Sequence, residues 1–223
     1  MAEIILMSDP KVAAVPVREC GERLVDVRRD GRLRVDARRV DGDGAFAQLR
    51  AGVFERLLKA QELLPEGLRL LFVEGYRPPS LQRRYFEEYG AKLRAAHPDW
   101  PAELVRSAAS RYVSPPGIAP HSAGAAVDLT LVDADDQELD MGTAVNANPE
   151  DSAGACYTGA DNINDTARAH RTILGSALTA AGLVNYPTEW CSQSSSCVQS
   201  LGVSHRSWEG LRRRAWPCKT TEH

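Results

Sequence analysis

The amino-acid sequence predicts an α+β domain in which helices flank a mainly antiparallel central sheet. Short apolar runs between glycines and prolines indicate strands, and longer segments with apolar residues at helical spacing indicate helices. Along the chain these segments follow the order hairpin, helix, strand, helices, strand, return strand, helix and strand. With 223 residues and 43% hydrophobic content the chain can bury a full core, so we expect one main domain.

The first predicted element is a β-hairpin in the segment LVDVRRDGRLRVD. A three-residue loop of Arg29, Asp30 and Gly31 places Val27 opposite Leu33, whereas a two-residue loop mismatches the apolar faces. We therefore expect the three-residue loop, with Gly31 in the left-handed conformation. The basic residues around the loop are expected to form a solvated strand face.

A helix and a buried strand follow the hairpin. Apolar residues recur at helical spacing between Phe46 and Leu64, and Pro65 marks the end of this amphipathic helix. Residues 68–74 form a short and almost wholly apolar run between two glycines, which indicates a buried strand. Both elements are expected to pack in the core.

Arg77 comes directly after this strand, in the turn EGYRPP. The two prolines that follow it fix the backbone, so its guanidinium is presented at a strand end. A structural ion pair with an acid is the alternative to a role in chemistry. Two helices then follow, one capped by Ser80 and one beginning near Pro101, and we expect them to cover one side of the sheet.

The stretch PHSAGAAVDLTLVD carries two candidate metal ligands, His121 and Asp128. Its second half alternates, so Val127 and Leu129 share one face of a strand and Asp128 points away from that face. His121 precedes the strand in a loop rich in proline and glycine, which can fold the imidazole back over the strand. A nitrogen and a carboxylate oxygen suit zinc. A hydrogen-bonded His–Asp pair without a metal is the alternative interpretation of this spacing.

The last predicted elements are a return strand, a helix and a final strand. The return strand covers residues 138–141, and a polar, glycine-containing loop at residues 148–163 is a candidate partial lid. The helix begins near Asn164 and stops at Gly182. The final strand covers residues 183–190.

Four segments resemble the D-alanyl-D-alanine dipeptidases of the VanX type, in zinc peptidase family M15. They are the H-x-x-G-x-A-x-D pattern from His121 to Asp128, the Y-R-P turn, MGTAVN and LVNYPTEW. The resemblance covers most of residues 20–190 and implies the hedgehog/D-Ala-D-Ala peptidase fold. It implies that His121 and Asp128 are two of three ligands of one zinc ion per chain. It also implies that Glu189 is the general base and that Arg77 stabilises the oxyanion of the tetrahedral intermediate.

The sequence departs from the family pattern at several site positions. The family segment E-W-W-H ends in the third zinc ligand, and this chain has Ser192 at that position. His205 is the next candidate downstream, in an irregular segment. Asn146 stands where some members have an acid near the substrate's ammonium, and Ala119 stands where members often have Ser. These departures predict weak zinc binding and weaker recognition of the amine.

The resemblance implies hydrolysis of the free dipeptide D-Ala-D-Ala, which removes a peptidoglycan precursor. Two alternatives stay open. A D,D-carboxypeptidase acting on longer cell-wall peptides would use the same site. A non-catalytic D-Ala peptide binder, or an inactive copy, would explain the missing third ligand, and metal content and turnover distinguish this alternative from the enzyme.

The composition agrees with a small-molecule partner. The net charge is −3 with acids and bases interspersed, so there is no electrostatic case for nucleic acid or for an anionic membrane. The start MAEIILMSDP has no basic region and only a short apolar run, and the five cysteines form no C-x-x-C pair. We therefore expect a cytoplasmic protein.

The composition changes near the end of the chain. We expect residues 1–190 to form the zinc D-Ala-D-Ala dipeptidase-like domain, and residues 191–223 to form a divergent, poorly ordered tail. From Cys191 onward Ser, Cys, Arg and Trp dominate, and no clear amphipathic period continues. This change fits translation of a GC-rich gene in a shifted frame, and it also fits a genuine divergent tail.

Overall fold

The fold is α+β, with a five-stranded, mainly antiparallel sheet as predicted. In this computed structural model, the described residues are 4–14, 21–38 and 41–195. The sheet order is β2-β4-β5-β7-β6, and only the β2–β4 pair among these is parallel. The strands are β2 (Arg34–Val35), β4 (Arg69–Glu74), β5 (Ala126–Val132), β6 (Leu183–Tyr186) and β7 (Glu189–Ser195). A separate antiparallel pair joins β1 (Leu24–Asp26) to β3 (Gln48–Arg50).

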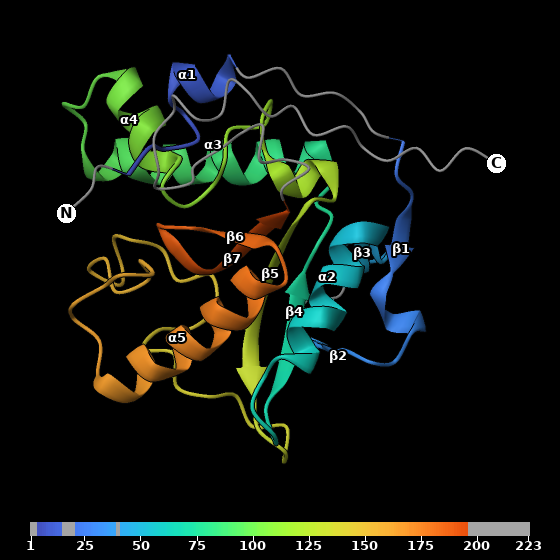
Figure 1. The fold of residues 1–223 in the computed structure, drawn as a ribbon. Coiled ribbons are helices and arrows are strands. Elements are labelled where there is room, and N and C mark those ends of the chain that lie inside the picture. Colours follow the sequence, from blue (N-terminus) through green and yellow to red (C-terminus); the bar gives the residue numbers. More distant parts are fainter. Residues whose placement is uncertain (1–3, 15–20, 39–40, 196–223) are drawn as a thin grey trace.

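The helices form two groups on the sheet (Figure 1). The helices are α1 (Pro10–Ala13), α2 (Ala51–Glu62), α3 (Pro79–Ala96), α4 (Ala102–Ala109) and α5 (Asp165–Ala180). Helices α2 and α5 contact each other and bury their apolar faces in the main core against β4 and β5. Helices α3 and α4 pack together in a second cluster and lie across one end of the sheet. None of the described helices is long and apolar enough to cross a membrane.

Strand β5 shows how the sequence pattern separates the core from the site. Val127, Leu129 and Leu131 belong to the main core, as their alternation predicts. Ala126 and Asp128, on the other face, line a cavity. Every residue of the strand is buried, because a central strand is covered on both faces.

The predicted hairpin is wrong. Strand β1 pairs with β3, β2 pairs with β4, and a 3-10 helix (Val27–Arg29) follows β1 directly. The physical reason is that side-chain hydrogen bonds stabilise a local turn in place of the hairpin ladder. The side chain of Asp26 accepts hydrogen bonds from the backbone N–H and the guanidinium of Arg28. Val27 and Leu33 are buried in the main core instead of facing each other across a ladder.

Several predicted boundaries also differ. Helix α2 begins at Ala51, because Phe46 lies in a 3-10 helix and residues 48–50 pair with β1 as β3. Helix α3 begins at Pro79 without a side-chain cap, so Ser80 lies inside it. The predicted return strand is reduced to one isolated bridge between Val132 and Glu138.

The end of the fold follows the prediction in part. The predicted single strand at residues 183–190 is wrong, because a turn at residues 187–188 divides it into β6 and the start of β7, which pair antiparallel. The side chain of Asn164 accepts a hydrogen bond from the backbone N–H of Ala167 at 2.7 Å and caps α5. Strand β7 begins at Glu189 and continues to Ser195, five residues beyond the expected domain boundary, between β5 and β6. Residues 196–223, including His205 and most of the expected tail, lie outside the described residues.

Candidate active site

His121 is held in place through its backbone and its ring. It lies in a short 3-10 helix (Pro120–Ala123), and its carbonyl accepts hydrogen bonds from the N–H groups of Arg77 and Gly124. Gly124 ends this helix at φ +66°, a conformation that favours glycine. The Nδ1 atom of His121 lies 2.7 Å from the carbonyl oxygen of Gly75. Because a carbonyl only accepts, Nδ1 donates this hydrogen bond and leaves Nε2 directed away from Gly75.

Asp128 faces Nε2 of this ring. Its Oδ1 atom lies 3.4 Å from Nε2 of His121, and its Oδ2 atom lies 3.8 Å from Nη2 of Arg77. Burial disfavours the charged carboxylate, but the charge and hydrogen bond of His121 and the charge of Arg77 hold the pKa of Asp128 below its usual value. The structure therefore brings together the two metal ligands predicted from the sequence. An imidazole nitrogen and a carboxylate oxygen at this separation fit a zinc ion, which takes such ligands at about 2.0–2.2 Å.

Arg77 is fixed by an acid and an amide. Its Nε and Nη2 atoms donate to the two carboxylate oxygens of Glu74 at 2.7 and 2.8 Å, and Nη1 donates to Gln82 at 3.0 Å. Burial opposes its charge, but Glu74 and then Asp128 raise the pKa of the Arg77 guanidinium above its usual value. Arg77 is therefore a permanent, oriented cation beside Asp128. Arg77 is ion-paired with Glu74 and also lines the cavity, and its role in chemistry stays a prediction.

Glu189, at the start of β7, has a carboxyl group whose pKa is shifted. Burial raises its pKa well above the usual value, the negative charge of Asp128 raises it further, and Arg77 opposes the shift. A carboxyl group of raised pKa in a cleft is a candidate general acid or base.

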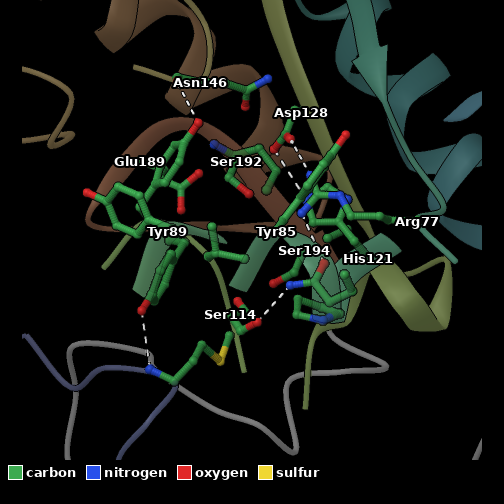
Figure 2. A pocket seen from close by; sticks show the side chains of 18 of the residues that line it. Arg77, Tyr85, Tyr89, Ser114, His121, Asp128, Asn146, Glu189, Ser192 and Ser194 are labelled. Carbon is green, nitrogen blue, oxygen red and sulfur yellow. Dashed lines mark hydrogen bonds and ion pairs between the residues drawn. The ribbon is translucent and has the colours of Figure 1, made fainter. Parts of the chain in front are cut away.

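These side chains surround one cavity of about 320 Å³. Figure 2 shows Glu189, Asp128, Arg77 and His121 directed toward one another, with Tyr85 and Tyr89 beside them. Asn146 also lines the cavity, and its carbonyl accepts a hydrogen bond from Tyr112 at 2.9 Å. None of the described lining residues comes from residues 148–163, but Glu150 of this loop accepts a hydrogen bond from Tyr89, which lines the cavity. A lid role for the loop stays a prediction.

The position at which the family pattern has its third zinc ligand lies on β7. Ser192 is opposite Asp128 in the β5–β7 ladder and lines the cavity. The neighbouring residue, Cys191, is buried, and its Sγ atom lies within 4.8 Å of carboxylate oxygens of both Asp128 and Glu189. Burial raises the pKa of this thiol well above its usual value, and the two carboxylates raise it further.

Sequence reasoning missed three residues of this site. Glu74 and Gln82 orient Arg77, and Cys191 stands next to the expected ligand position. Glu74 ends an apolar run, and an acid at the end of a buried strand next to an arginine was the available signal. For Cys191 the available signal was its soft thiol beside a metal motif.

A buried imidazole–carboxylate pair, a nearby carboxyl of raised pKa and an oriented arginine around one small cavity define a metallohydrolase site. A family model described as D-Ala-D-Ala dipeptidase matches residues 45–196, and the chain belongs to this family of peptidases. A D-alanyl-D-alanine dipeptidase of Synechocystis sp. is 26% identical over 208 residues, which cover 79% of this chain and 83% of the relative.

Two solved structures are also similar. One is a mutant of the vancomycin-resistance D,D-pentapeptidase VanY in complex with Zn(II), with 15% identity, 85% of this chain and 84% of that chain covered, and a TM-score of 0.42. The other is VanYB in complex with D-alanine-D-alanine, with 16% identity, 73% and 78% covered, and a TM-score of 0.43.

Proposed function

We propose that this chain is a zinc-dependent peptidase that hydrolyses the free dipeptide D-Ala-D-Ala, and that residues up to Ser195 form its catalytic domain. The observation that carries the proposal is the convergence of His121, Asp128 and Glu189 on one cavity. Membership of the D-Ala-D-Ala dipeptidase family supports the substrate class. A cavity of about 320 Å³ also suits a ligand as small as a dipeptide.

In this proposal His121 and Asp128 hold the zinc ion. The hydrogen bond from Nδ1 to Gly75 fixes the tautomer and the orientation of the His121 ring, as a supporting partner of a metal ligand does. When bound, zinc supplies a water of lowered pKa and polarises a substrate carbonyl. The buried position of Asp128 keeps its carboxylate directed at Nε2 of His121.

Glu189 is proposed to move the proton. Its carboxylate form takes a proton from the attacking water, and its protonated form, favoured by the raised pKa, delivers that proton to the leaving amine. Such proton transfer contributes about 10²–10⁴-fold to a rate.

Arg77 is proposed to stabilise the negative charge that develops on the substrate carbonyl oxygen. Glu74 and Gln82 hold its guanidinium before the substrate arrives, so the charge does not have to reorient during the reaction. Asn146, at the cavity wall, is proposed to accept a hydrogen bond from the substrate amine without adding charge.

The proposal is tested by incubating the zinc-supplemented chain with D-Ala-D-Ala and following free D-alanine by NMR. We expect release of D-alanine that depends on zinc and is lost in Glu189→Gln. Glu88→Gln, which changes an exposed carboxyl that also lines the cavity, is the matched control and should retain the activity. No release above the Glu189→Gln background would contradict the proposal and would favour a non-catalytic binder.

The D,D-carboxypeptidase alternative is tested in the same assay with an acylated D-Ala-D-Ala peptide. Equal rates on the free and the acylated peptide would favour that alternative, because an enzyme for the free dipeptide must recognise its amine.

A further inference from the structure

The third protein ligand of the metal is absent from the position where the family pattern has it, and the structure offers a replacement one residue earlier. Ser192 carries a neutral hydroxyl, which is a poor zinc ligand compared with an imidazole. Cys191, by contrast, brings a sulfur atom within 4.8 Å of carboxylate oxygens of Asp128 and Glu189. Asp128 is the group common to this cluster and to the contact with His121, at 3.4 Å.

We propose that Cys191 is the third protein ligand of the metal, together with His121 and Asp128, and that this chain has a Cys/His/Asp site. The proposal rests on the metal dependence of the proposed function but not on its substrate. Two ligand atoms bound to one zinc ion at about 2.0–2.3 Å lie roughly 3.5 Å apart. The Asp128 and Cys191 ligand atoms, within 4.8 Å of each other, therefore need only a small side-chain movement to share an ion.

The sulfur of Cys191 is shielded from solvent. Cys191 is 2% exposed and belongs to the main core, next to Trp190.

A site with one thiolate, one imidazole and one carboxylate ligand can bind zinc. Catalytic zinc sites with cysteine and histidine ligands are known, and a soft thiolate favours zinc over magnesium or manganese. In this arrangement Glu189 stays outside the ligand set, so it remains available for proton transfer. Metal binding at Cys191 releases the thiol proton to solvent, because the thiolate is the form that binds.

The test is titration of the full-length, metal-free chain with Co²⁺, followed by absorbance. A cobalt–thiolate bond gives a charge-transfer band in the near ultraviolet that nitrogen and oxygen ligands do not give. We expect this band in the parent chain, its loss in Cys191→Ala, and at least a tenfold weaker affinity for Zn²⁺ in that variant. Cys156→Ala is the matched control, because Cys156 is also buried but its sulfur contacts the carbonyl of Thr188 instead.

Further variants keep the proposal open to refutation. His121→Gln should weaken Zn²⁺ binding as Cys191→Ala does, whereas Glu189→Gln should leave the cobalt band in place. A band that persists in Cys191→Ala, or no band in the parent, overturns the proposal. Loss of Zn²⁺ affinity in Glu189→Gln equal to that in Cys191→Ala also overturns it, because Glu189 would then be a ligand.

Two controls separate this proposal from others. Circular dichroism of each variant shows whether it is folded, and adding Ser192→His to Cys191→Ala should restore Zn²⁺ affinity without restoring the band. If the band appears but D-alanine is not released, the proposed function fails and the ligand assignment stands. If Cys191→Ala releases D-alanine at the parent's rate and zinc dependence, the ligand assignment fails and the function stands.

Discussion

Asp128 and Ser192 lie directly opposite each other where β5 pairs with β7. This register places position 192 next to the carboxylate that contacts His121, so an imidazole at this position could share a metal ion with both residues. The hydroxyl that Ser192 has at this position is a poorer zinc ligand than the imidazole expected from the family pattern.

The first prediction concerns this position. Ser192→His should raise Zn²⁺ affinity at least tenfold and raise D-Ala-D-Ala turnover with it, because the new nitrogen faces the existing ligands. Competition with a chromogenic chelator measures the affinity. Ser194→His, also on β7 at the cavity wall, is the matched control and should change affinity little. Equal gains in the two variants would show that the register does not select the ligand.

The second prediction concerns proton transfer. Glu189→Gln should lower turnover by about 10²–10⁴-fold, because the amide cannot take up and release a proton. Zinc content should stay close to that of the parent, since Glu189 is not assigned as a ligand. Steady-state kinetics and metal analysis of the same preparation check both statements, and a turnover close to that of the parent would remove Glu189 from the mechanism.

The third prediction is a pH dependence of stability in the metal-free chain. The folded-state pKa of Glu189 is raised above the ordinary value of 4.5, so between that pH and the raised pKa the folded chain binds more protons than the unfolded chain. The free energy of unfolding must therefore fall as pH rises through this window. Glu189→Gln should remove this part of the slope and be more stable than the parent above the window.

Urea unfolding at several pH values, in the presence of a chelator, measures this slope. The linear dependence of the unfolding free energy on urea gives the stability at each pH. Glu88→Gln, at an exposed carboxyl, should leave the slope as in the parent. An identical slope in the parent and in Glu189→Gln would show that Glu189 does not have the raised pKa.

The sequence predicted β5 and its two faces because alternation depends only on local geometry. Val127 and Leu129 enter the core and Asp128 faces the cavity, as a period of two residues requires. The cap at Asn164 could be predicted for the same reason. The predicted hairpin was wrong because the side chain of Asp26 binds Arg28, two residues away. The two short strands β1 and β2 pair with β3 and β4 instead of with each other.

The position of Cys191 could not be predicted from local patterns either. Its sulfur reaches Asp128 only because β7 lies between β5 and β6, and no pattern around residue 191 specifies that order. The orientation of Arg77 by Gln82 likewise needs helix α3 to follow the turn at once. The family motif indicated which residues meet, whereas the supporting contacts required the structure.

The fourth prediction concerns substrate choice. Free D-Ala-D-Ala should be cleaved at least ten times faster than L-Ala-L-Ala, because a site arranged for one stereoisomer leaves polar groups unpaired with the other. An acylated D-Ala-D-Ala should also be cleaved more slowly than the free dipeptide. This difference in rate should be smaller if Asn146 makes only a neutral contact with the amine. Competition between the peptides in one NMR sample gives the ratios of kcat/KM.

The last prediction concerns the backbone support of His121. The carbonyl of Gly75 accepts the hydrogen bond from Nδ1, and a Cβ atom at Gly75 would lie 2.4 Å from the backbone oxygen of Gln48. Gly75→Ala must therefore displace this segment, with an expected loss of about 1–3 kcal/mol in unfolding free energy, typical of overpacking. Because the carbonyl moves with it, Zn²⁺ affinity should also fall by about 10–100-fold, as for the loss of other partners that orient metal ligands.

Gly117→Ala is the control for this change, since Gly117 is exposed and a Cβ there meets nothing within 4 Å. It should leave stability and Zn²⁺ affinity unchanged. Thermal unfolding of both variants, with and without zinc, separates the packing effect from the effect on the metal. If Gly75→Ala lost stability equally in both conditions and kept the parent's Zn²⁺ affinity, the hydrogen bond from His121 Nδ1 to the Gly75 carbonyl would have no part in metal binding.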